Sequence, residues 1–129
     1  MQLTTNLDAA DGTINTLSKS VWNGNTEIAA GIDLGIEELA SPRSRRFADR
    51  VMIVLTDGFP TAGDALASAT KAASQRITVY AITFGPDGDQ SYMRQLAAAG
   101  QGEHAHAATE NELKAIFKRF AAKATILIQ

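Results

Sequence analysis

Two oxygen-bearing side chains, those of Asp57 and Thr26, stand at positions where α/β proteins bind ligands. Asp57 closely follows the most apolar run of the chain, residues 51–55, and Thr26 opens a helical pattern after a loop that contains Gly24. Open α/β sheets bind ligands outside the carboxyl ends of their strands. Carboxylate and hydroxyl oxygens are hard ligands that suit Mg²⁺ and similar cations, so Thr26 and Asp57 are candidate metal ligands. The plainer interpretation makes Thr26 a helix cap and Asp57 part of a turn.

His104 and His106 form a second candidate site. Their spacing places two imidazoles on one face of a short strand, close to Glu103. A structural zinc site takes four ligands, so two histidines without a third partner do not specify one. We therefore interpret the pair as the end of a strand at the surface.

Four arginines lie close together in the middle of the chain. They predict a solvated basic loop, and contact with a phosphate or an acidic partner is the alternative. The residues are Arg43, Arg45, Arg46 and Arg50.

The composition excludes several classes of function. The 129 residues include 12 Lys+Arg and 14 Asp+Glu, which gives a formal net charge of −2, and no cysteine. The net charge does not show the excess of basic residues that is typical of nucleic-acid-binding proteins. The lack of cysteine excludes thiol catalysis and cysteine-ligated zinc. The first residues do not form a signal-peptide pattern, and no apolar run approaches the roughly 20 residues of a membrane span. We expect neither a nucleic-acid partner nor a membrane span in this chain.

The elements that must position these side chains alternate along the chain. Apolar residues at helical spacing, and continuous apolar runs typical of strands in a parallel sheet, predict an α/β fold with three layers, a mostly parallel sheet flanked by helices on both faces. One segment, Thr125 to Ile128, is β-prone and does not fit the alternation. The expected helices are 7–17, 26–39, 62–74, 91–99 and 110–123, and the expected strands are 51–55, 77–84 and 103–107.

Three motifs in this order resemble a von Willebrand factor type A domain. They are the loop and helix start at residues 23–28, the strand that ends in Thr56-Asp57-Gly58, and the later strand that ends in Phe84-Gly85. The resemblance implies a Rossmann-like fold and a metal-ion-dependent adhesion site at the top of the sheet. It also implies a binding module, not an enzyme.

In this family a D-x-S-x-S loop, a threonine and an aspartate hold a divalent cation, and an acidic side chain of a protein partner completes its shell. By motif, Thr26 matches the threonine and Asp57 matches the aspartate. The resemblance therefore implies Mg²⁺, or Mn²⁺ or Ca²⁺, as the cofactor and an acidic protein ligand as the partner.

The chain departs from the family pattern at its beginning. It has no D-x-S-x-S loop and no apolar strand before its first helix. The segment most similar to that loop, residues 11–15, lies inside a helical pattern. We therefore expect residues 1–129 to be a partial domain, the carboxyl-terminal two-thirds. With only two matching ligands, Thr26 and Asp57, we expect a degenerate site whose metal binding is weak or absent. Similarity to domains of bacterial envelope and Tad-type pilus-assembly proteins favours the bacterial envelope or the extracellular space, with the cytoplasm as the alternative.

Enzymes offer an alternative for Asp57. A strand that ends in aspartate resembles the Walker B element of nucleotide hydrolases and the phosphoacceptor strand of receiver domains. However, the chain has no phosphate-binding G-x-x-x-x-G-K-[ST] loop and no acidic pair after a first strand. It also offers no nucleophile and base pair, so we expect no enzymatic activity.

A structural role is the third hypothesis. Without a strand on its other side, the segment 51–55 becomes a long apolar edge, which invites pairing with another chain. Thr125 to Ile128 is a candidate to fill this edge, in its own chain or in a partner. Association of copies through the exposed strand edge is therefore possible.

Overall fold

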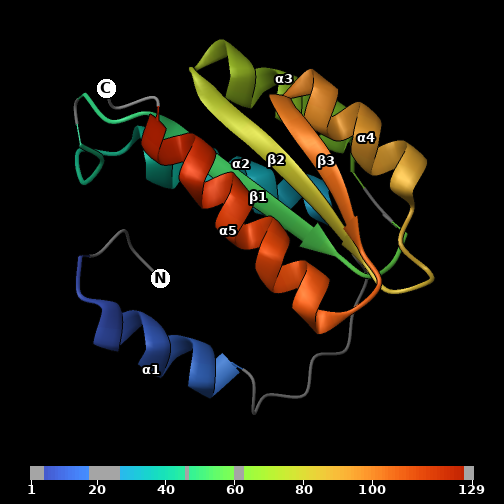
Figure 1. The fold of residues 1–129 in the computed structure, drawn as a ribbon. Helices are drawn as coiled ribbons and strands as arrows, with labels where there is room; N and C mark the ends of the chain where they lie inside the picture. The colour runs from blue at the N-terminus through green and yellow to red at the C-terminus, as the bar shows by residue number, and fades with distance from the viewer. Residues whose placement is uncertain (1–4, 18–26, 46, 60–62, 127–129) are drawn as a thin grey trace.

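The computed structural model describes residues 5–17, 27–45, 47–59 and 63–126. Helices and strands follow one another in the predicted order, and the described elements form the predicted α/β fold (Figure 1). Their bounds are α1 Leu7–Leu17, α2 Ile28–Ala40, β1 Arg50–Thr56, α3 Ala65–Ser74, β2 Ile77–Phe84, α4 Gln90–Ala99, β3 Gln101–Ala107 and α5 Glu110–Ile126.

The three strands form one parallel sheet with the order β1-β2-β3. Strand β1 pairs with β2 in continuous register from Arg50 opposite Ile77 to Thr56 opposite Thr83. The central strand β2 is almost wholly buried, because it has a strand on either side and helices on both faces. The continuous β-branched and apolar run at residues 77–84 therefore predicts a buried strand correctly.

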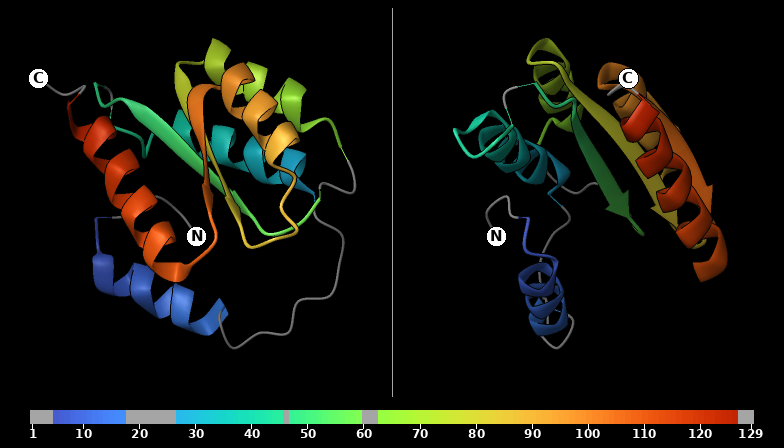
Figure 2. Two further views of the ribbon diagram at one scale, coloured as in Figure 1. Left: turned by 45° about the vertical axis from the view of Figure 1, so that its right-hand side comes forward. Right: turned by 60° about the vertical axis from the view of Figure 1, so that its left-hand side comes forward.

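Helices cover the sheet unequally. α2, α3 and α4 lie on one face and α5 lies alone on the other, which makes three layers (Figures 1 and 2). The first face buries the larger core, with Ile32, Val79 and Leu96 among its fully buried side chains. On the second face, Tyr80 of β2 stacks on Phe120 of α5, with ring centroids 4.5 Å apart.

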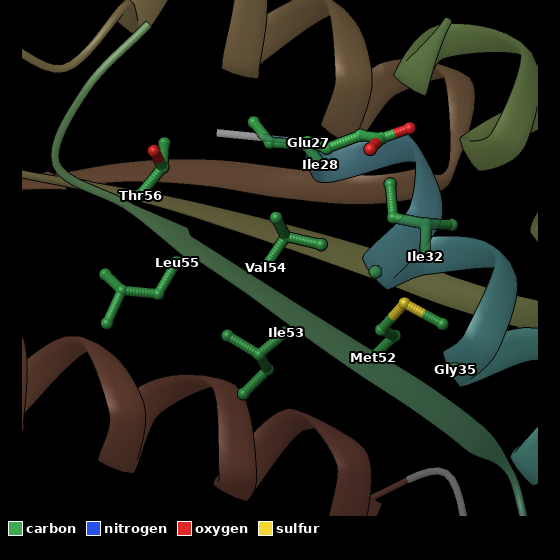
Figure 3. A pocket seen from close by; sticks show the side chains of 10 residues that line it. Glu27, Ile28, Ile32, Gly35, Met52, Ile53, Val54, Leu55 and Thr56 are labelled. Atoms are coloured by element: carbon green, nitrogen blue, oxygen red, sulfur yellow. The ribbon is translucent and has the colours of Figure 1, made fainter. Parts of the chain in front are cut away.

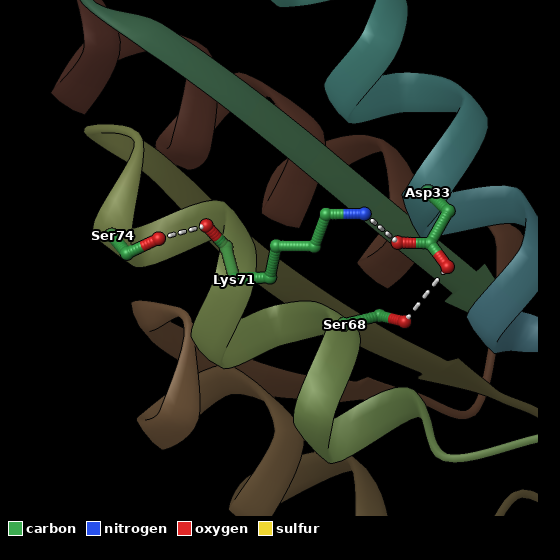
Figure 4. A network of polar contacts seen from close by, with 4 residues as sticks. All are labelled: Asp33, Ser68, Lys71 and Ser74. Atoms are coloured by element: carbon green, nitrogen blue, oxygen red, sulfur yellow. Dashed lines mark hydrogen bonds and ion pairs between the residues drawn. The ribbon is translucent and has the colours of Figure 1, made fainter.

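A polar network joins α2 to α3 beside the first core (Figure 4). The Lys71 ammonium donates to one oxygen of Asp33 at 3.1 Å, and the Ser68 hydroxyl donates to the other at 3.3 Å. Exposed ion pairs contribute about 0–1 kcal/mol, so this contact fixes the position of α2 more than it stabilises the fold.

Helices α3 and α4 begin at other residues than their patterns predict. α3 starts at Ala65 instead of residue 62, because Gly63 adopts a positive φ of 75° and the Asp64 side chain caps the helix by accepting from the Ala67 N–H. Asp89 caps α4 in the same way at the Tyr92 N–H, so α4 begins at residue 90. A capping side chain thus decides each start.

The start of α2 also differs from its prediction. Its N-cap residue is Glu27, which makes no side-chain capping bond, and the helix begins at Ile28. The predicted range 26–39 places Glu27 inside the helix, and that prediction is wrong, because Glu27 is the residue just before the first turn. Thr26, the predicted cap, lies outside the described residues.

α5 is longer than predicted and contradicts the idea of a final strand. It continues through Thr125 to Ile126, so these two residues are helical, and residues 127 and 128 lie outside the described part. Ala121, Ala122 and Ala124 have high helix propensity. Lys123 pairs with Glu103 of β3, which ties the last turns to the sheet.

β1 is less buried than a strand with two covered faces. Its apolar residues are half-buried, and Leu55 is 47% exposed. The prediction of burial on both faces is therefore wrong, but the prediction that this strand becomes an edge is confirmed, because β1 pairs only with β2 in the described sheet. The absent neighbour explains the exposure.

Helix α1 stands apart from the other layers. Two of its apolar side chains, Leu7 and Ile14, are 75% and 62% exposed. Figure 2 shows α1 separated from the sheet when the molecule is turned. The helical spacing of its sequence predicts the element correctly, but among the described residues it buries no apolar face.

Candidate functional site at the carboxyl edge of the sheet

Asp57 lies in the turn that follows β1, with its side chain exposed at the carboxyl edge of the sheet. The turn is organised by its neighbour: the Thr56 hydroxyl accepts from the Gly58 N–H and donates to the Gly58 carbonyl, both at 3.3 Å. Thr56 is buried, so its hydroxyl is committed to the backbone. The arrangement presents the Asp57 carboxylate to solvent.

The start of α2 borders the same edge. Thr26, the second predicted ligand, lies outside the described residues, so its place relative to Asp57 stays a prediction. The adjacent residue, Glu27, lines a cavity together with Thr56. Sequence reasoning missed Glu27 because it treated this residue as part of the first helical turn.

The donor set on the described residues does not fit a tight cation site. Among them, no three His, Cys, Asp or Glu side chains lie close enough together to hold a metal ion. Mg²⁺ requires near-octahedral oxygen coordination, which the single exposed carboxylate of Asp57 does not supply.

The two histidines meet at a buried hydroxyl. Thr83 Oγ1 lies 3.1 Å from His104 Nε2 and 3.0 Å from His106 Nδ1. The Thr83 hydroxyl has one hydrogen, so it donates to only one of the two imidazoles, and the other imidazole must donate its N–H to the hydroxyl oxygen. The prediction of a plain surface strand end is therefore incomplete, because both rings are held against β2.

Burial lowers the pKa of His104, and the charges of Arg94 and His106 lower this pKa further. The imidazole therefore favours its neutral form more than a free histidine does. Thr83 is fully buried, so its hydroxyl is not accessible to a substrate despite the neighbouring base. The cluster joins β2 to β3 and does not form a nucleophile site.

Thr83 could have been found from the sequence. β1 ends in Thr56, and Thr83 is the residue before the end of β2; the register places Thr56 opposite Thr83 and Thr83 opposite His106. Aligning the ends of the three predicted strands gives this row of polar residues.

The predicted basic loop after α2 holds an ion pair. Arg43 donates from Nε and Nη2 to the two carboxylate oxygens of Glu38, at 2.9 and 2.6 Å. This bidentate pair closes the loop, so Arg43 is not simply solvated. Arg46 lies outside the described residues.

A cavity of about 380 Å³ runs along the open edge of β1. Figure 3 shows β1 in the centre, with α2 on one side and α5 on the other. The lining comes from consecutive residues of β1 and from one face of α2. The lining residues are Met52, Ile53, Val54, Leu55 and Thr56 of β1 and Glu27, Ile28, Gly31, Ile32 and Gly35 of α2 or its start.

A parallel sheet between helical layers, with an exposed aspartate at its carboxyl edge, defines an α/β protein of the Rossmann-like class. The model of the von Willebrand factor type A domain family matches residues 1–119, and the chain belongs to this family.

Solved structures with the same fold come from diverse organisms. An aerotolerance-related membrane protein from Bacteroides fragilis has a TM-score of 0.77 at 20% identity, over 92% of this chain and 70% of that one. BatB from Bacteroides thetaiotaomicron has a TM-score of 0.70 at 18% identity, over 81% and 62%. The manganese-loaded TRAP protein of Plasmodium vivax has a TM-score of 0.71 at 22% identity, over 93% and 51%.

A curated relative extends well beyond the matched region. The uncharacterized protein sll0103 of Synechocystis is 30% identical over 99 residues, which cover 74% of this chain and 23% of that protein. The chain thus spans about a quarter of the length of this relative. Among the described helices, none combines the length and the apolar character needed to cross a membrane.

Proposed function

We propose that the chain is a protein-binding module of the adhesion type, with its interaction site at the carboxyl edge of the sheet around Asp57. The exposed Asp57 carboxylate, presented by the Thr56 turn beside the start of α2, is the observation that carries this proposal. Members of this family generally mediate protein interaction or adhesion.

Thr26 and Asp57 are, in this proposal, the remaining ligands of a divalent cation, Mg²⁺, Mn²⁺ or Ca²⁺. Residues 1–129 are then the later part of a domain, and the ligand set is incomplete. The family commonly binds a divalent metal, and TRAP was manganese-loaded in its structure. With too few oxygen ligands, the chain binds the cation weakly or not at all. An acidic side chain of the protein partner is the group that a bound cation would attract.

Titration calorimetry with Mg²⁺ and with Mn²⁺ tests the state of the site. We expect no binding tighter than about 1 mM, since an incomplete oxygen shell leaves the cation largely hydrated. Any weak binding should disappear in Asp57→Ala and persist in Asp87→Ala, which removes an exposed aspartate from the loop after β2. Tight binding that Asp57→Ala abolishes would show that the site is intact.

The place of action that we propose is the bacterial cell envelope or the extracellular space. The membrane protein of Bacteroides fragilis supports this location. Fractionation of the native organism, with an antibody against this chain, tests it, and recovery in the cytosol alone would contradict it.

A further inference from the structure

We propose that Thr83, His104 and His106 form an acid-sensitive clasp between β2 and β3. At neutral pH the clasp holds the carboxyl half of β3 against β2, and it releases this half when both imidazoles carry a proton. β3 lies on the opposite side of β2 from β1, and the clasp uses no residue of the proposed metal site. The device therefore works without Thr26, Asp57 and a bound cation.

Strand β3 has little apolar surface to hold it in place. Its apolar side chains are those of Ala105 and Ala107, which are buried but small. Alanine is depleted in strands, because it offers little side chain to pack on a pleated surface. The ladder with β2 shifts register between Val79 and Ala81, and it is continuous from residue 104 to the end of β3. Both histidines lie in this continuous stretch, so their contacts strengthen the pairing where β3 depends on it.

The hydroxyl of Thr83 limits how many protons the clasp can hold. Its Oγ1 lies 3.1 Å from His104 Nε2 and 3.0 Å from His106 Nδ1, and it donates to one ring and accepts from the other. The ring that accepts needs a lone pair on its contacting nitrogen. The ring that donates keeps its N–H when its other nitrogen gains a proton. The clasp therefore takes one proton without loss, and a second proton removes one hydrogen bond.

Exposure decides which ring gains the first proton. His106 is exposed, whereas His104 is partly buried. Solvent stabilises a charge on His106, which then donates from Nδ1 to Thr83, so His104 must accept at Nε2. A proton on His104 removes this lone pair, and the fully buried Thr83 hydroxyl loses its acceptor. The proton on His104 is therefore the one that opens the clasp.

The groups around His104 oppose this second proton in the closed state. Burial lowers the pKa of His104 most, and the positive charges of Arg94 and His106 lower it further. In the loop before α4, Gly88 packs against Thr83, since a Cβ built on it would lie 2.9 Å from the Thr83 Cβ. The other charged groups on the elements packed against β3 are Asp87, which is exposed, Asp89, which caps α4, and Arg119 and Lys123 of α5, which pair with Glu103 on the opposite face of the sheet.

Opening removes these effects, so acid favours the open state. An exposed histidine has a pKa near its ordinary value of 6.5, above that of His104 in the closed state. As pH falls below 6.5, the open state therefore gains a proton that the closed state resists. The ratio of open to closed chains rises by at most about tenfold per pH unit, until the pKa of the closed state is passed.

Amide hydrogen exchange on the full chain, followed by NMR at several pH values, tests the clasp. The quantity to compare is the protection factor, which corrects for the pH dependence of exchange in an unstructured peptide. From about pH 7 to 5.5 we expect the protection of the β3 amides that face β2 to fall several-fold, and by no more than about tenfold for one proton. Because the opening is local, this protection should change little in low urea.

His104→Gln is the decisive variant, because the glutamine amide can accept a hydrogen bond from Thr83 but does not titrate. We expect its β3 protection near pH 7 to equal that of the wild type and to stay constant in acid. Thr83→Val removes the hydroxyl and keeps the branched shape, and it should lower β3 protection several-fold already near pH 7. Thr83→Ser is the matched control, which keeps the hydroxyl and should keep the protection.

Arg94→Gln tests the contribution of the neighbouring charge. With this charge removed, the closed state resists the proton on His104 less, so the fall in β3 protection should be smaller than in the wild type. Lys118→Gln removes one positive charge from an exposed position on α5 and should leave the fall unchanged.

Three results would overturn the clasp. They are β3 protection that does not vary with pH, an equal fall in His104→Gln, and a fall that depends on urea as steeply as global unfolding does, because the whole chain would then open. Nitrogen-15 shifts of the imidazoles add a direct readout of the tautomers. We expect Nε2 of His104 to lack a hydrogen while His106 is charged, and a hydrogen on that nitrogen would contradict the proposed order of protonation.

Discussion

At Thr83, one buried hydroxyl between two imidazoles ties β3 to the central strand. One ring nitrogen of each histidine contacts this hydroxyl, and His104 is partly buried whereas His106 is exposed. Arg94 places a positive charge near His104. A positive neighbour disfavours both a proton and a cation on this ring.

We expect this histidine to make the fold sensitive to mild acid. The pKa of His104 is lowered below its ordinary value of 6.5, chiefly by burial. As pH falls below 6.5, the unfolded chain gains a proton that the folded chain resists, so the free energy of unfolding decreases until the folded pKa is passed. Above 6.5 the effect is absent. Urea unfolding between about pH 7.5 and 5.5 should show a smaller decrease for His104→Gln than for the wild type.

The neighbouring residue, Glu103, also titrates, but its effect on the free energy of unfolding falls in a different pH range. The pKa of Glu103 is lowered, mainly by its bond to Lys123, so its contribution is lost only as pH falls below about 4.5, a separate window. Identical pH dependence of wild type and His104→Gln above pH 5.5 would contradict the assigned environment of this imidazole.

At the scale of elements, the pattern of apolar residues predicts which helices and strands exist, and in what order, better than it predicts the residues at which they begin and end. The bounds of α1 and β2 agree with their periodicity, since both sequences change character sharply at each end. The starts of α3 and α4 depend on Asp64 and Asp89 as caps, and several nearby polar residues would have been equally plausible caps. α5 runs past its predicted end because no breaker interrupts its alanines.

α1 offers a prediction about an element that buries no apolar face. The double variant Leu7→Gln, Ile14→Gln should change the free energy of unfolding by no more than about 0.5 kcal/mol, because both side chains are already exposed. Ile32→Ala, in the core of α2, should cost about 2–5 kcal/mol. Urea unfolding measures both. A loss above about 1 kcal/mol in the double variant would mean that α1 packs on the domain in solution.

At the scale of the whole molecule, the sheet is asymmetric: its buried centre is β2, and one of its edges, β1, is apolar and open. The sequence predicts this edge, because a two-sided apolar strand appears without a partner before it. It also predicts the place of Asp57, since a residue after a parallel strand must lie at the carboxyl edge. The Thr83 contacts were not predicted, because they join residues 21 and 23 positions apart and emerge only when the ends of β2 and β3 are placed in register.

This asymmetry should be measurable in the free protein by hydrogen exchange. We expect slow exchange along all of β2, which has a strand on each side, and an alternation of slow and fast amides along β1. The alternation arises because only every second β1 amide faces β2. Uniform protection of β1 in the free chain would show that its outer edge is already paired.

The stacked rings of Tyr80 and Phe120 give the molecule an optical signal of its tertiary structure. The pair joins the central strand to α5 with an interplanar angle of 23°. Aromatic rings contribute to near-ultraviolet circular dichroism only while their packing is fixed, whereas far-ultraviolet signals survive in loosely packed states. The pair therefore contributes to a near-ultraviolet spectrum that distinguishes, without a label, a correctly folded preparation from a collapsed one.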